Sequence, residues 1–143
     1  MTHTLPTAGT TTPSLDAARF LRLVLRVDSA STAVMAAVLI AACVPLGSAT
    51  GMPVGFTVGF GIYQLGGAAA LALIAGYPVI PPGLVRAVIA VNAASAVACV
   101  TVAFADLVDL TGFGVAFMLI GALVVTVYAV LESAGLRRMT ATA

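Results

Sequence analysis

The chain has 143 residues, of which 62% are apolar and only 8% are charged, and its formal net charge is +1. Soluble domains carry about 25% charged residues, so a water-soluble fold of this size would leave much of this apolar sequence exposed. The small net charge also excludes the dense basic surface that electrostatic binding of nucleic acid requires. We therefore interpret the chain as one all-α membrane domain.

The elements expected along the chain are four membrane-spanning helices joined by short loops. Residues 1–13, with the single histidine His3, are Thr-rich without apolar periodicity and are expected to form a disordered tail. The transmembrane domain then occupies residues 14–138, and residues 139–143 form a C-terminal tail. Pro45 and residues 47–51 are expected to form the first loop. The predicted spans, each near the length of about 20 residues that a bilayer needs, are about 23–44, 54–76, 84–105 and 113–132.

One stretch of the chain occurs twice. Leu21–Ser31 (LRLVLRVDSAS) recurs in weaker form at Val85–Ser95 (VRAVIAVNAAS), with five identities in eleven positions. Asp28 aligns with Asn92, and each follows an arginine by six residues. Because the two stretches open the first and third spans, they predict an up-down bundle of two hairpins. The hairpins are parallel repeats about an axis along the membrane normal.

The arginines indicate how these spans are oriented. With a cytoplasmic N-terminus, all six arginines fall on the inner side, whereas the two outer loops contain none and carry Asp106 and Asp109. This is a complete positive-inside pattern, so both termini are expected in the cytoplasm. The six are Arg19, Arg22, Arg26, Arg86, Arg137 and Arg138.

Polar residues from three spans are expected to lie at one depth in the inner leaflet. At a rise of about 1.5 Å per residue, Asp28 and Asn92 lie about 9 Å deeper than the arginines that precede them. Arg26 and Glu132 fall in the same layer. Ionisable groups at this depth are costly and normally face the bundle interior, where they find partners. The expected ion pairs join Arg26 or Arg86 to Asp28 or Glu132.

Two interpretations of this polar cluster remain open. In the first, arginine–carboxylate pairs act as a structural clasp that locks the helix ends. In the second, the cluster lines a polar cavity that opens to the cytoplasmic side and holds a headgroup, a proton or a small polar ligand. Gln64 in the second span is a secondary polar point, either an interhelical hydrogen bond or part of a pocket that reaches the cluster. The candidate residues of the cluster are Arg26, Asp28, Arg86, Asn92 and Glu132.

Small residues recur at helical spacing in three spans. Gly51, Gly55, Gly59 and Gly67 form one stripe, and alanines repeat at intervals of four in the first and third spans. Such stripes predict close helix packing without distinguishing internal packing from dimerisation. Cys43 and Cys99 lie within apolar segments, where cysteine behaves as a small hydrophobe. Whether the two cysteines pair stays open.

The sequence contains no recognisable catalytic or cofactor motif. It has no nucleophile–base pair, no metal-ligand set and no pair of haem-ligating histidines, and its glycine pairs follow no strand and so are not dinucleotide-binding loops. No catalytic residue, metal or cofactor is therefore expected. The favoured function is a non-enzymatic membrane subunit or scaffold. The alternative is a small binder or carrier of a lipid, quinone or small polar ligand. Membrane lipids are expected partners, and a membrane-protein partner or a homo-oligomer stays open.

Polar positions also carry a resemblance to a known group. The pattern LRLxLRxD entering the first span, Arg86 and Asn92 entering the third, and the ending LESAGLRR over residues 131–138 resemble small four-helix integral membrane proteins of bacteria. More distantly, the chain is similar to the DoxX-like group. The likeness covers roughly residues 20–138. It implies a four-helix protein of the bacterial inner membrane. The wider group is linked to oxidoreductase complexes and thiol stress, so the resemblance also implies a role as a partner subunit.

Overall fold

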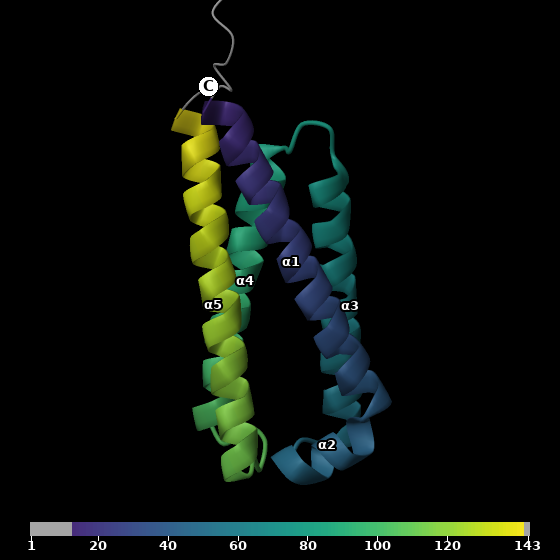
Figure 1. Cartoon of the computed structure of the whole chain (residues 1–143). Coiled ribbons are helices and arrows are strands. Elements are labelled where there is room, and N and C mark those ends of the chain that lie inside the picture. The colour runs from purple at the N-terminus through teal and green to yellow at the C-terminus, as the bar shows by residue number, and fades with distance from the viewer. Residues whose placement is uncertain (1–12, 142–143) are drawn as a thin grey trace, which may run out of the picture.

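The computed structural model describes residues 13–141 and contains five helices and no strand in this range (Figure 1). Four of these helices, α1, α3, α4 and α5, are long and apolar enough to cross a membrane. The expected all-α, four-span bundle is therefore confirmed. Residues 1–12, with His3 and nearly all of the predicted tail, lie outside the described residues. The helices are α1 (Pro13–Ala41), α2 (Cys43–Thr50), α3 (Val54–Gly76), α4 (Pro82–Phe104) and α5 (Gly112–Ala141).

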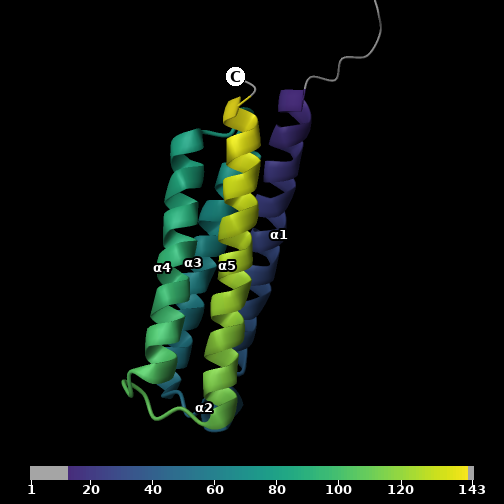
Figure 2. The ribbon, with the colours of Figure 1, turned by 90° about the vertical axis from the view of Figure 1, so that its left-hand side faces the viewer.

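The four long helices run alternately down and up the bundle. Helices α1 and α4 point one way and α3 and α5 return, so the two hairpins enter in the same sense (Figures 1 and 2). The start of α1, the α3–α4 turn and the end of α5 meet at one end, which we call the arginine end because all six arginines lie toward it. Arg22 holds this end together, since its guanidinium donates hydrogen bonds to the carbonyls of Ala75 (2.5 Å) and Pro78 (3.2 Å).

Helix α2 replaces most of the loop that was expected at residues 45–51. The chain turns at Ala42 and continues as a helix from Cys43 to Thr50, which lies across the end of the bundle opposite the arginine end (Figure 1). The prediction failed because Pro45 is the third residue of α2, and proline is tolerated in a first helical turn, where its missing N–H is not needed. Gly51, with a φ of 81°, then ends the helix in the left-handed conformation that glycine favours.

The other end of the chain also departs from the prediction. Helix α5 continues to Ala141, so residues 139–141 extend the helix and do not begin a separate tail. The helix has 30 residues, about 45 Å at the usual rise, which exceeds the hydrocarbon thickness of about 30 Å. The last turns of α5, which carry Arg137 and Arg138, therefore reach beyond the apolar core of a bilayer.

Packing within the bundle is uneven. Helix α1 packs along α3 and α5, and α4 packs along α5, whereas α3 and α4 contact each other only sparsely. Gly61 permits the approach of α1 and α3, because an added Cβ would lie 3.2 Å from the carbonyl oxygen of Ala36. Gly114 does the same for α2 and α5, since an added Cβ would overlap the carbonyl oxygen of Thr50. These two close approaches thus depend on glycines that the sequence stripe did not include.

The predicted glycine stripe is mostly not used for packing inside the chain. A Cβ added at Gly55, Gly59 or Gly67 would meet no atom within 4 Å. Their common face is therefore open, and the close contacts expected along it within the bundle are absent. The two cysteines are free thiols, and Cys99 is buried.

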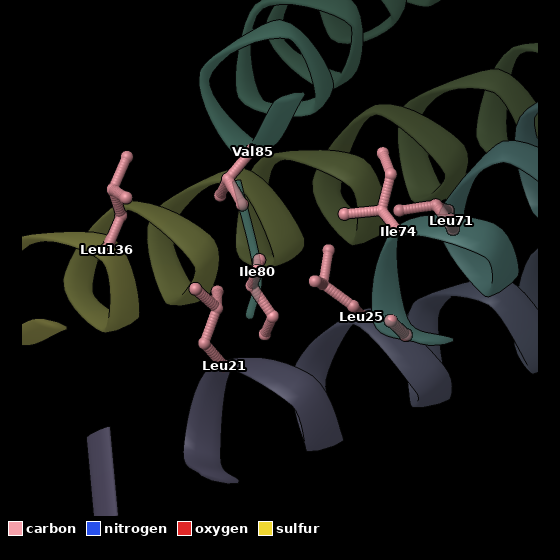
Figure 3. Close-up of a cluster of buried hydrophobic side chains, with 8 residues drawn as sticks. Leu21, Leu25, Leu71, Ile74, Ile80, Val85 and Leu136 are labelled. Carbon is pink, nitrogen blue, oxygen red and sulfur yellow. The ribbon is translucent and has the colours of Figure 1, made fainter. Parts of the chain in front are cut away.

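Two apolar clusters form the core. The one toward the arginine end brings together side chains from α1, α3, α4, α5 and the α3–α4 turn (Figure 3). The other, toward the α2 end, contains Met52, Cys99, Met118 and Ala122, with Phe56 and Phe60 packed against them. The cluster at the arginine end, which we call the apolar seal, consists of Leu21, Leu25, Leu71, Ile74, Ala75, Ile80, Val85 and Leu136.

Candidate functional site

Three polar side chains from three helices meet between the two apolar clusters. Asp28 comes from α1, Asn92 from α4 and Glu132 from α5. Asp28 and Glu132 are 1% and 0% exposed, and Asn92 is half-buried. The long apolar runs around these residues specify the helices, and the pairing of α1, α4 and α5 brings their side chains together. We call Asp28, Asn92 and Glu132 the carboxyl–amide site.

Asn92 connects the two carboxyl groups. Its amide nitrogen donates to Asp28 Oδ2 at 3.2 Å and to Glu132 Oε2 at 3.1 Å. Because both oxygens bond the same nitrogen, they lie no more than about 6 Å apart. The Thr32 hydroxyl, one turn along α1, donates to the other Asp28 oxygen at 3.0 Å. Asp28 is therefore held from two sides.

Glu132 is less well satisfied than Asp28. Its second oxygen, Oε1, is buried and has no hydrogen-bond partner. Among the buried side-chain nitrogen and oxygen atoms of residues 15–141, it is the one left without a partner. A buried acceptor without a donor is costly, so each such atom calls for an explanation.

The expected ion pairs with arginine are not formed. Arg26 and Arg86 are both exposed, and neither makes a hydrogen bond or ion pair with Asp28 or Glu132. The two arginines lie on the outward faces of α1 and α4, where long side chains can reach the polar edge of the membrane. The clasp made of arginine–carboxylate pairs is thus corrected: an amide and a hydroxyl, not a cation, hold the carboxyl groups.

Gln64 stands apart from the carboxyl–amide site. It is half-buried on α3, and no hydrogen bond joins its amide to another described residue. Its neighbour Tyr63 makes the interhelical bond instead, since the hydroxyls of Tyr63 and Ser95 lie 2.9 Å apart and link α3 to α4.

The carboxyl–amide site is closed toward the arginine end. Leu25 precedes Asp28 by three residues and Leu136 follows Glu132 by four, so both lie one turn nearer that end, within the apolar seal (Figure 3). With exposures of 1% and 0%, neither carboxyl group reaches solvent. The expected polar cavity open on this side is therefore not present in this conformation.

Two crossed hydrogen bonds relate the hairpins to each other. Ser31 on α1 bonds the hydroxyl of Tyr128 on α5, and Ser95 on α4 bonds that of Tyr63 on α3, each at 2.9 Å. Ser31 and Ser95 are equivalent positions of the repeat, and the tyrosines occupy matching places on the second helix of each hairpin. Each repeat thus offers the same contact to the other, as expected for two halves related by a two-fold axis.

The carboxyl–amide site lies on the same pseudo-two-fold axis between the hairpins. Asp28 and Asn92 are equivalent residues and hydrogen-bond each other, as residues on an axis would. Glu132 breaks the symmetry, because Gly67 is the position on α3 that matches it when Tyr63 is aligned with Tyr128.

Sequence reasoning missed Thr32 and the two tyrosines. The 65-residue spacing of the tyrosines, beside the 64-residue spacing of the serines, was a usable signal.

The chemistry of the carboxyl–amide site follows from its charge. Two carboxylates together in apolar surroundings are costly, and residues 13–141 supply no cation that contacts them. The pair therefore suits a ligand that is cationic or that donates hydrogen bonds. Its main acceptor atoms are the carboxyl oxygens of Asp28 and Glu132, and no group of three or more His, Cys, Asp or Glu residues occurs in the described part of the chain.

The four long apolar helices and their outward-facing apolar side chains define a multi-pass membrane protein. No protein-family model, curated protein or solved structure matches the chain.

Proposed function

We propose that this protein is a small membrane carrier whose carboxyl–amide site binds a proton and exchanges it for a small cation. The main support is the fully buried Glu132. Its Oε1 has no hydrogen-bond partner, and its other oxygen shares one amide donor with Asp28. Acceptors outnumber donors at this site, so it suits a ligand that is cationic or donates hydrogen bonds. A quinone, whose carbonyls only accept hydrogen bonds, matches it less well.

The closed conformation supports the proton as the resident ligand. A proton on one carboxyl group lowers the charge of the pair and supplies the missing donor, and it needs no cavity. A larger cation requires the apolar seal to part. We therefore propose that the seal opens the site toward the arginine end during exchange.

The experiment measures proton release from the purified protein in weakly buffered dodecyl maltoside solution with a pH-sensitive dye. Two probes are added in turn, sodium chloride and ethylammonium chloride. At least one of them should release protons from the wild type, because a bound cation replaces the proton on the carboxyl pair.

Matched variants assign the release to the site. Glu132→Gln keeps the shape of the side chain and should abolish proton release. Asp16→Asn removes an exposed carboxyl of α1 and should leave the release unchanged. Wild-type protein that releases no protons with either probe, or release that persists unchanged in Glu132→Gln, would contradict the proposal.

We further propose that the protein lies in the bacterial inner membrane with both termini in the cytoplasm. The support is that every arginine lies toward one end of the bundle, whereas Asp106 and Asp109 lie in the loop at the other end. By the positive-inside rule, this asymmetry supports a cytoplasmic arginine end. The resemblance to small bacterial four-helix proteins points to the same membrane.

A second candidate function is that of a non-enzymatic subunit or scaffold, as the resemblance to the DoxX-like group implies. Its specific support is the open face of α3, where Gly55 and Gly59 have no neighbouring atoms and where α4 makes few contacts. A partner helix can approach closely along such a face. Crosslinking in intact membranes tests this, because Gly59→Leu should remove a partner crosslink, whereas Gly121→Leu, at another open glycine on α5, should retain it.

A further inference from the structure

A groove runs along the outer surface of the bundle between α4 and α5. Its volume is about 470 Å³, within the range of about 300 to 1,000 Å³ that ligand pockets usually have. Its lining includes none of the three residues of the carboxyl–amide site, so an inference about it does not depend on the proposed function. Its lining includes Ala93 and Ala96 of α4 and Ala129, Val130, Ala134 and Arg137 of α5.

The body of the groove suits an apolar occupant. Most of its lining is alanine and valine, whose short side chains leave a trough between the two helices. Thr126 and Ser133 also line it, but their hydroxyls donate to the backbone carbonyls of Ala122 and Ala129, each at 2.7 Å. The groove therefore offers no free side-chain donor along its length until Arg137.

Two arginines flank the groove near the arginine end. The Asn92–Glu132 hydrogen bond sets the register of α4 against α5. Arg86 is six residues from Asn92 and Arg137 is five from Glu132, so the two lie at nearly the same level, about 9 and 7.5 Å from that bond. Arg86 also shares the face of α4 that carries Ala93, seven residues later.

Both guanidinium groups are available to a ligand. Arg86 and Arg137 are exposed, and neither guanidinium group forms a hydrogen bond or ion pair with another described residue. No carboxylate lines the groove. By contrast Arg22, the repeat equivalent of Arg86, is bound to two backbone carbonyls. The two positive charges at the end of an apolar trough therefore call for an anionic group attached to an apolar chain.

We propose that this groove binds an anionic phospholipid, with one acyl chain along the alanine-lined trough and the phosphate between Arg86 and Arg137. Guanidinium groups match phosphate oxygens in geometry, often with two parallel hydrogen bonds. Basic pockets between transmembrane helices suit the headgroups of anionic lipids. The small residues of the groove serve the lipid and not another helix, since a helix there would leave both arginines without an anion.

The test uses native mass spectrometry of the delipidated full-length protein in detergent, titrated with palmitoyl-oleoyl-phosphatidylglycerol. Each basic residue near an anionic lipid is worth about a fivefold change in affinity, so Arg86→Gln and Arg137→Gln should each weaken binding roughly fivefold and the double variant roughly 25-fold. Arg19→Gln, an exposed arginine of α1, is the matched control and should bind like the wild type.

Two further measurements separate the lipid from other occupants. Ala96→Phe fills the trough without changing charge, and it should weaken phosphatidylglycerol binding at least fivefold while leaving helicity unchanged. Phosphatidylcholine, which has no net charge, should bind more weakly than phosphatidylglycerol. Unchanged binding in the double arginine variant or in Ala96→Phe would overturn the proposal. So would inorganic phosphate that binds as tightly as the lipid, because it would define a free-anion site.

Discussion

Replacing Asn92 by leucine should destabilise the bundle through the two carboxyl groups. The change keeps a similar side-chain volume but removes the nitrogen that donates at 3.2 Å to Asp28 and at 3.1 Å to Glu132. Asp28 then retains only the Thr32 hydroxyl, and Glu132 has no donor at all. Each interhelical hydrogen bond in a membrane bundle contributes about 0.6 to 2 kcal/mol. Two lost bonds therefore predict a free energy of unfolding lower by about 1 to 4 kcal/mol.

The assay is reversible unfolding in mixed dodecyl maltoside and dodecyl sulfate micelles, followed by far-ultraviolet circular dichroism. Gln64→Leu is the matched control, because it removes an amide that makes no hydrogen bond, and it should stay within about 0.5 kcal/mol of the wild type. A double-mutant cycle between Asn92→Leu and Glu132→Leu should give a coupling energy of about 1 kcal/mol. An Asn92→Leu variant as stable as the control, or a cycle without coupling, would refute the assignment of Asn92 as the bridging donor.

Three further predictions concern packing, symmetry and orientation. Gly114→Ala should lower the free energy of unfolding by about 1 to 3 kcal/mol, because its Cβ would overlap a carbonyl of α2, whereas Gly121→Ala, in open space, should not. The exchange Asp28→Asn with Asn92→Asp should lower the free energy of unfolding by about 0.6 to 2 kcal/mol in the same assay, because one amide and one carboxyl still pair between α1 and α4 while Glu132 loses its amide donor. Asn92→Asp alone, which places three carboxyl groups together, should cost clearly more. In a cysteine-free background, Leu107→Cys should react with a membrane-impermeant maleimide added outside intact spheroplasts, and labelling only after lysis would reverse the proposed orientation.

The two hairpins of the repeat contact each other in a nearly symmetric way. The crossed Ser31–Tyr128 and Ser95–Tyr63 bonds show each hairpin making the same contact with the other. The symmetry is not complete, since α1 packs along α5 while α3 and α4 contact only sparsely. Glu132 adds a second carboxyl group where the first hairpin has Gly67. The proposed carrier site therefore lies where the two halves of the repeat differ.

The sequence by itself determined the four spans and the polar residues that lie buried within them. Uncharged runs of about 20 residues can only be satisfied as helices in a bilayer, because every backbone polar group must bond within its own segment. Polar side chains are also costly to expose to lipid, so the sequence indicated that three of them face inward: Asp28, Asn92 and Glu132. The eleven-residue repeat also predicted the parallel arrangement of the hairpins, including the equivalence of Asp28 and Asn92.

Only the tertiary structure decided which partners these groups have. Helical spacing places Arg26 near Asp28 in depth but does not fix which way a long, flexible side chain extends, and both Arg26 and Arg86 extend outward. Which glycine lies at a helix crossing, Gly61 rather than Gly59, depends on the rotation of α3 against α1. The apolar seal and the α4–α5 groove likewise come from side chains distant in sequence. Apolar segments of nearly uniform composition specify helices strongly, but their rotation and register follow from packing between helices, which no single segment contains.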